Sequence, residues 1–174
     1  MKWIAIAAWA VLLSACGTRA NIGGSDNPVK IRVQFEEPKD ERYPHLQIRK
    51  RSWMTYLDGN NGSAQFPLVT ATACNSERTS CKQAVVKSGI VLNGAERVDG
   101  AVRITGVLKS EMGRSKTLKT LSASSTNETT STISAGVAVI GEEVSEQPFN
   151  LRILPGAETQ LRGLGGIVIF IDAP

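Results

Sequence analysis

The sequence has 174 residues, a formal net charge of +4 and few aromatic residues, which make up 5% of the total. Its basic residues are spread along the chain and few aromatic rings are present to stack on bases, so we expect no nucleic-acid partner. Gly, Ser, Thr and Val are common, a composition that favours short strands joined by turns within one domain over long helices.

The chain opens with a segment typical of a secretory leader. A short basic start, Met1-Lys2, precedes eleven apolar residues from Trp3 to Leu13. As a helix, this run would cover only about 16 Å of a hydrocarbon core about 30 Å thick. It therefore predicts a cleaved signal peptide over residues 1–15 rather than a transmembrane span.

The motif Leu13-Ser14-Ala15-Cys16, with Gly17 after it, resembles the lipobox of bacterial lipoproteins. The resemblance implies cleavage before Cys16, a diacylglyceryl group on the Cys16 thiol and an acyl chain on the new amino group. Two or more chains are needed because a single acyl chain binds a bilayer only marginally. The alternative is an ordinary signal peptide with an incidental cysteine.

Residues 16–27 read as the lipid-bearing cysteine and a flexible tether, because Gly17 to Asn27 holds almost no apolar side chain. In enterobacteria-like envelopes, Asp at the position after the lipidated cysteine is the usual signal for retention in the inner membrane. Gly17 stands there instead, so we expect an outer-membrane location with a periplasm-facing lipid anchor. For residues 28–174 we expect an all-β domain, a single antiparallel β-sandwich or meander.

The first strand is predicted from Pro28 onward, where Val29, Ile31, Val33 and Phe35 alternate with polar residues. A charged, aperiodic loop follows over residues 37–44. The run from His45 to Leu57 fits two short strands or one bent strand. Its candidate interaction residues are Arg49, Lys50, Arg51, Trp53 and Tyr56. The basic triplet could contact anionic lipid headgroups or a partner, or it could form no more than a solvated turn.

Three short polar stretches predict tight turns between strands. Residues 58–62 read Asp-Gly-Asn-Asn-Gly and predict a hairpin ahead of a strand over 66–73. Asn93-Gly94 and Asp99-Gly100 are favoured dipeptides for reversals, so residues 82–108 are expected to form a β-meander.

Cys74 and Cys81 are the two thiols that remain if Cys16 carries lipid, and export would place them in an oxidising compartment. We expect them to form a disulfide, which on the chain-entropy model stabilises the fold by about 2.5 kcal/mol. The alternative is a metal site, but structural zinc needs four ligands and the single histidine, His45, lies far off in the sequence. We expect neither a metal nor another cofactor.

The segment from Lys116 to Ser134 is dominated by Ser and Thr and predicts long hydroxyl-rich strands, with a disordered insert over residues 122–131 as the alternative. Residues 117–134 carry little charge and no proline, so they form a candidate sheet edge open to a partner strand, with Thr130 and Thr132 as test positions. The apolar residues 135–140 are expected to continue this strand.

The C-terminal part predicts two further strands. Phe149 to Leu154 is one, closed by a turn at Pro155-Gly156. The other is the apolar run from Ile167 to Ile171, which must be covered on both faces and therefore belongs in the core. The glycines of residues 163–166 precede a strand rather than open a helix, so they predict a bend and not a dinucleotide site.

A sequence of features between Met54 and Ile140 is similar to the strand rhythm of the outer-membrane β-domain of secretins. The features are Asp58-Gly59, Phe66-Pro67, Gly89-Ile90-Val91-Leu92, Val102-Arg103-Ile104 and Val137-Ala138-Val139-Ile140-Gly141. The similarity implies antiparallel strands and assigns no residue role, since the chain departs from the family at the disulfide loop and lacks the long amphipathic membrane hairpins.

No catalytic constellation is apparent, because the many serines have only His45 as a potential base. We expect no enzyme; one with a carboxylate pair assembled from distant strands is the alternative. The sequence predicts a structural or interaction module of a cell-envelope assembly, of the secretion, pilus or conjugation type, with a protein partner. The other interpretation is a periplasmic binder of a small ligand or envelope polymer, with a cleft lined by Trp53, Tyr56 and the Arg49–Arg51 cluster.

Overall fold

The computed structural model describes residues 29–43, 51–121 and 125–174. The predicted signal peptide, lipobox and tether, together with His45, Arg49 and Lys50, lie outside these ranges. No helix in the described part of the chain is long and apolar enough to cross a membrane.

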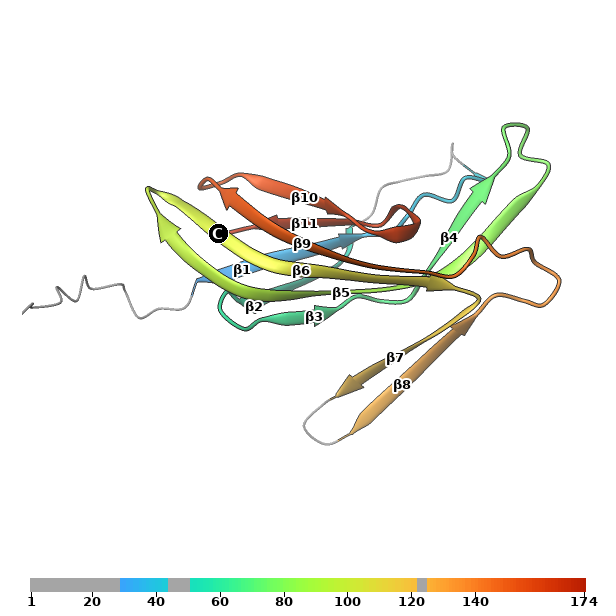
Figure 1. The fold of residues 1–174 in the computed structure, drawn as a ribbon, viewed down its shortest axis with the longest axis horizontal. Helices are drawn as coiled ribbons and strands as arrows, with labels where there is room; N and C mark the ends of the chain where they lie inside the picture. Colours follow the sequence, from blue (N-terminus) through green and yellow to red (C-terminus); the bar gives the residue numbers. More distant parts are fainter. Residues whose placement is uncertain (1–28, 44–50, 122–124) are drawn as a thin grey trace, which may run out of the picture.

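The fold is all-β, as the composition predicts, and its long strands form two sheets packed face to face (Figure 1). The first sheet has the strand order β10-β11-β1-β2, and the second has the order β3-β5-β6-β9, with β4 also paired to β5. All pairings between these strands are antiparallel. The strand bounds are β1 Lys30–Glu36, β2 Arg51–Asp58, β3 Ser63–Gln65, β4 Val69–Cys74, β5 Cys81–Val98, β6 Ala101–Gly113, β9 Glu143–Ile153, β10 Glu158–Arg162 and β11 Val168–Asp172.

Strands β1 and β11 supply the centre of the first sheet, and both predictions from their patterns are confirmed. The alternating residues Ile31, Val33 and Phe35 of β1 are fully buried against the second sheet. In β11 the inward residues and also Phe170, on the opposite face, are buried, so the strand is covered on both sides. An apolar run with no polar alternation therefore marks a strand enclosed on both faces.

The turn at residues 58–62 is present, but the predicted hairpin is wrong. The Gly62 N–H donates a hydrogen bond to the Asp58 carbonyl oxygen over 2.7 Å. However, β2 pairs with β1 in the first sheet, whereas β3 pairs with β5 in the second, Ser63 lying opposite Val91. The turn therefore carries the chain around one edge of the sandwich.

Of the two dipeptides in residues 82–108, only one reverses the chain. Asp99 and Gly100, with φ of 49° and 72°, close the long β5–β6 hairpin, in agreement with the prediction. Asn93-Gly94 instead lies within β5, where the pairing with β6 shifts register between Leu92 and Gly94. A bulge accommodates the extra residue there, because both halves of β5 find partners along the same strand β6.

The expected strand over residues 135–140 is also wrong, because this segment forms a loop around the end of β5. It makes one isolated bridge, in which the Gln83 N–H donates to the Ala138 carbonyl and the Ile140 N–H donates to the Gln83 carbonyl. Strand β9 begins only at Glu143 and runs along β6 to Ile153. Residues 135–140 therefore connect the ribbon to β9 of the second sheet.

Candidate interaction surface

The Ser/Thr-rich segment forms a ribbon of two strands, β7 (Ser115–Leu121) and β8 (Thr126–Thr132), that pair with each other. Figure 1 shows this ribbon leaving the end of β6 and diverging from the two packed sheets. The prediction of hydroxyl-rich strands is correct for both ranges. The segment is an edge of its own two-stranded sheet, however, and not of either large sheet as expected.

The base of the ribbon is fixed to the sandwich. Ile133 is buried, and the Arg114 guanidinium donates hydrogen bonds to the carbonyl oxygens of Ile133 and Ser134 over 3.3 and 3.2 Å. The Lys116 ammonium lies 3.9 Å from a Glu111 carboxylate oxygen and 3.7 Å from one of Glu142. The ribbon therefore has a defined origin and extends from it with few further contacts.

The hydrogen-bonding pattern determines which backbone groups of β8 point away from β7. At the base, the Ile133 N–H donates to the carbonyl oxygen of Arg114, directly opposite, over 2.8 Å. In an antiparallel ladder, hydrogen-bonded and non-hydrogen-bonded pairs alternate. Counting along the register, the backbone bonds of Asn127, Thr129 and Ser131 face β7. The outward N–H and C=O groups are therefore those of Thr126, Glu128, Thr130 and Thr132.

Side-chain contacts agree with this assignment. Opposing side chains approach more closely in non-hydrogen-bonded pairs. The Ser115 and Thr132 hydroxyls are 2.8 Å apart, and those of Thr117 and Thr130 are 2.9 Å apart. The Lys119 ammonium follows on the same face, 3.5 Å from the Glu128 carboxylate. A ladder of hydroxyl pairs closed by one ion pair therefore runs along one face of the ribbon.

The outer edge of β8 is open and less protected than the edge strand β9 of the second sheet. Strand β8 has extensive contacts with β7 alone, and all its residues except the half-buried Ser131 are exposed. Its one charged residue is Glu128, and it has no proline. By contrast, the edge strand β9 carries Pro148 near its middle together with Glu143, Glu146 and Arg152. Proline and charge are the devices that keep a free edge from accepting another strand.

Trp53 and Tyr56, which the sequence placed in one cleft, do not lie together. Trp53 and Tyr56 lie on opposite faces of β2, as an odd spacing in a strand requires. The Trp53 ring packs inward, edge-on to Phe66 with the centroids 5.2 Å apart, whereas Tyr56 points outward and is 53% exposed. Arg51 begins β2, and the side chains of the Arg49–Arg51 cluster are not among those described.

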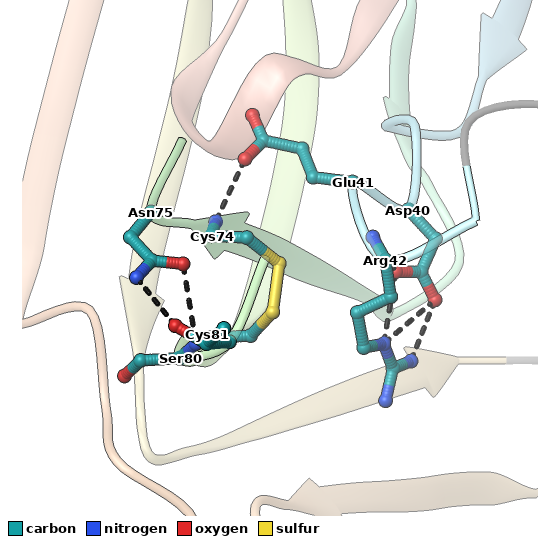
Figure 2. Close-up of a disulfide and its surroundings, with 8 residues drawn as sticks. Asp40, Glu41, Arg42, Cys74, Asn75, Ser80 and Cys81 are labelled. Atoms are coloured by element: carbon teal, nitrogen blue, oxygen red, sulfur yellow. Dashed lines mark hydrogen bonds and ion pairs between the residues drawn. A yellow bond between two sulfur atoms is a disulfide. The ribbon is translucent and has the colours of Figure 1, made fainter. Parts of the chain in front are cut away.

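The predicted disulfide is confirmed. Cys74 and Cys81 lie opposite each other at the last register pair of β4 and β5, and their sulfur atoms are bonded (Figure 2). Inside the loop, the Asn75 side chain accepts a hydrogen bond from the Ser80 N–H and donates one to the Thr79 hydroxyl. The bridge and the asparagine together hold a turn that has no apolar residue of its own.

A loop from the end of β1 lies along the outer edge of β4. Thr72 forms a parallel bridge with Asp40, and the Cys74 N–H donates to a Glu41 carboxylate oxygen over 2.8 Å (Figure 2). Beside it, hydrogen bonds from the Arg42 guanidinium lower the pKa of Asp40 below its usual value. This edge is therefore covered, and no sequence pattern in the charged loop predicted that role.

A hollow of about 560 Å³ opens between this loop, β4 and the strands β10 and β11. Its size is within the range of ligand pockets. Its lining combines charged and apolar side chains, among them Glu37, Lys39, Arg162, Met112 and Phe170. The lining residues come from segments far apart in the sequence, so no local pattern indicated the hollow. Within residues 29–43, 51–121 and 125–174, no group of three or more His, Cys, Asp or Glu could hold a metal ion.

Comparison with known proteins gives no family assignment, since no family model, curated protein or solved structure matches the sequence. The ribbon of β7 and β8, which stands as a sheet of its own beside the two larger sheets, is the feature on which a functional proposal can rest.

Proposed function

We propose that the protein is an interaction module of a cell-envelope assembly, of the secretion, pilus or conjugation type, held at the outer membrane by a lipid on Cys16. In this proposal the sandwich is a rigid support, and the ribbon presents the β8 edge to an extended segment of a partner protein. The partner strand adds to the ribbon through main-chain hydrogen bonds. No catalytic step is involved.

The observation that carries the proposal is the undefended edge of β8. Four residues offer outward N–H and C=O groups, and each hydrogen bond that an added strand makes contributes about 0.5–1.5 kcal/mol net. All residues of β8 except Ser131 are exposed, so this strand adds little to the core of its own sandwich. The lipobox-like Leu13-Ser14-Ala15-Cys16 supports the location, because such a sequence would fix the domain at a membrane surface.

The test compares what the full chain binds in cross-linked envelope membranes before and after the edge is blocked. Thr130→Pro with Thr132→Pro removes two outward N–H groups, so we expect the co-purifying proteins to be lost while the melting temperature changes little. Thr130→Val with Thr132→Val is the matched control, since it removes the hydroxyls and keeps the N–H groups. Unchanged capture by the double proline variant would refute the proposal.

The 560 Å³ hollow favours a second candidate, a periplasmic binder of a small ligand or envelope polymer. The mixed lining would suit a ligand with both charged and apolar parts, such as a peptidoglycan peptide. Muropeptides should then raise the melting temperature of the full chain, and Gln160→Trp, which fills the hollow, should abolish that rise. A muropeptide-induced shift that survives the substitution would exclude the hollow as the site.

A further inference from the structure

We propose that the strand added at the β8 edge is β8 of a second copy of this chain. The two strands run antiparallel around a two-fold axis at Thr129, and the two ribbons become one sheet with the order β7-β8-β8-β7. This inference rests on the proposed function, because it uses the same open edge. It specifies that the strand bound there comes from a second copy of the chain.

The backbone restricts how two copies can pair. The outward groups of β8 belong to Thr126, Glu128, Thr130 and Thr132, and in an antiparallel ladder they must bond outward groups of the other strand. Full overlap of the strands then places Thr126 opposite Thr132 of the second copy and Glu128 opposite its Thr130. Every outward N–H and C=O group of both strands finds a partner in this register.

Charge agrees with the same register. Glu128 is the only charged residue of β8, and like charges directly opposite each other destabilise a sheet. With the axis at Thr129, Glu128 faces Thr130 of the second copy. A shift that moves the axis to Glu128 would place the two carboxylates face to face. Each carboxylate is also compensated within its own ribbon by Lys119, 3.5 Å away.

The side chains of β8 suit a copy of the same strand better than an unrelated one. All seven residues are Thr, Ser, Asn or Glu, so the strand offers hydroxyls and no apolar pocket that could select a foreign side chain. A second β8 places its Thr126 beside Thr132, and so continues the hydroxyl pair that already joins Ser115 to Thr132 across the ribbon. Threonine pairs across strands are among the combinations that stabilise sheets.

Growth of the sheet stops at two copies. On the far side of each ribbon, β7 carries Lys116 and Lys119 and contacts β5 and β6 of its own sandwich, so that edge is less suited to accept another strand than the edge of β8. The long edge strand β9 carries Pro148. A two-fold interface uses the same patch on both subunits and therefore closes. The expected product is a dimer.

The test uses disulfide trapping at the axis. In the proposed register, Thr129 faces itself in a non-hydrogen-bonded pair, where Cα atoms lie about 4.5 Å apart, a separation that a disulfide can bridge. The full chain carrying Thr129→Cys, purified in detergent and treated with copper phenanthroline, should form a covalent dimer. Thr120→Cys is the matched control, because Thr120 is exposed on the same face of the ribbon but lies on β7, with two strands between it and its equivalent in the second copy.

Two further variants separate this inference from the proposed function. Adding Thr130→Pro to Thr129→Cys removes one outward N–H from each copy, so we expect the rate of trapping to fall about tenfold. Equal trapping of Thr129→Cys and Thr120→Cys would overturn the self-pairing. If capture of envelope proteins still depended on the outward N–H groups in that case, the proposed function would stand with a different partner.

Discussion

Cys74 shows how single residues fix the end of a strand. Its backbone N–H is held by Glu41, its side chain is bonded to Cys81, and it closes the β4–β5 ladder. The three interactions link the loop after β1, the edge of the second sheet and the polar turn 75–80. The disulfide therefore stabilises more than the short loop that it closes.

Replacing both cysteines by serine tests this at the scale of the residue. We expect a loss of about 2–3 kcal/mol in the free energy of unfolding, because the eight-residue loop regains its freedom in the unfolded chain. Denaturant unfolding of the full chain under non-reducing conditions measures it. Glu41→Gln is the comparison, which should cost less because its amide oxygen still accepts from the Cys74 N–H. Equal stability of the serine variant and the parent would contradict the expectation.

At the scale of the element, β8 has two kinds of backbone position that alternate along the strand. The bonds of Thr129 and Ser131 hold the ribbon together, whereas those of Thr130 and Thr132 face outward. The same substitution should therefore have opposite consequences at neighbouring residues. Proline substitutions at an inward and at an outward position of β8 can therefore be compared directly.

Ser131→Pro should loosen the ribbon, because it removes an N–H that bonds β7, whereas Thr130→Pro should leave the ribbon closed. Amide hydrogen exchange measures the difference. We expect faster exchange at Lys116, Leu118 and Thr120 in the first variant and near-parental exchange in the second. If both prolines accelerated exchange equally, the assignment of inward and outward groups would be wrong.

Strands could be predicted from the sequence where the pattern of apolar residues by itself shows which side chains are buried. The alternation in β1 and the apolar run before Asp172 each identified a core strand without reference to a partner. Residues typical of turns were a weaker guide to where the chain reverses. The dipeptides at 93–94 and 99–100 are both favoured in reversals, yet only the second reverses the chain, because strand pairing over the whole length of β5 decides between a bulge and a turn.

The composition of the segment indicated an open edge, but it did not indicate where in the fold that edge would lie. A lack of charge and proline over residues 117–134 identified a strand poorly protected against pairing, and the structure confirms that β8 is exposed. The sequence did not indicate that the strand stands apart from both large sheets, in a ribbon that begins where the chain leaves β6 after Gly113. The hollow and the covered edge of β4 depend on contacts between distant segments, which no local pattern encodes.

At the scale of the whole molecule, a lipid on Cys16 would determine where the ribbon can act. Cys16→Ser should move the full chain from the detergent phase to the aqueous phase in a phase-partitioning assay, because it removes the thiol that would carry the lipid. Cys74→Ser is the matched cysteine control and should partition like the parent. Retention of the Cys16→Ser variant in the detergent phase would contradict lipidation as the anchor.

The placement of β1 has a mechanical consequence. A membrane anchor and a partner at the ribbon would pull on opposite ends of the sandwich, since β1 begins beside Gly59 and Ala95 whereas the ribbon starts beyond Gly113 (Figure 1). Such a force would run along β1, which is hydrogen-bonded to β2 on one side and β11 on the other. It would load both rows of bonds in shear, so they would have to break together instead of one after another. The first strand after the anchor is thus the one best placed to carry tension through the domain.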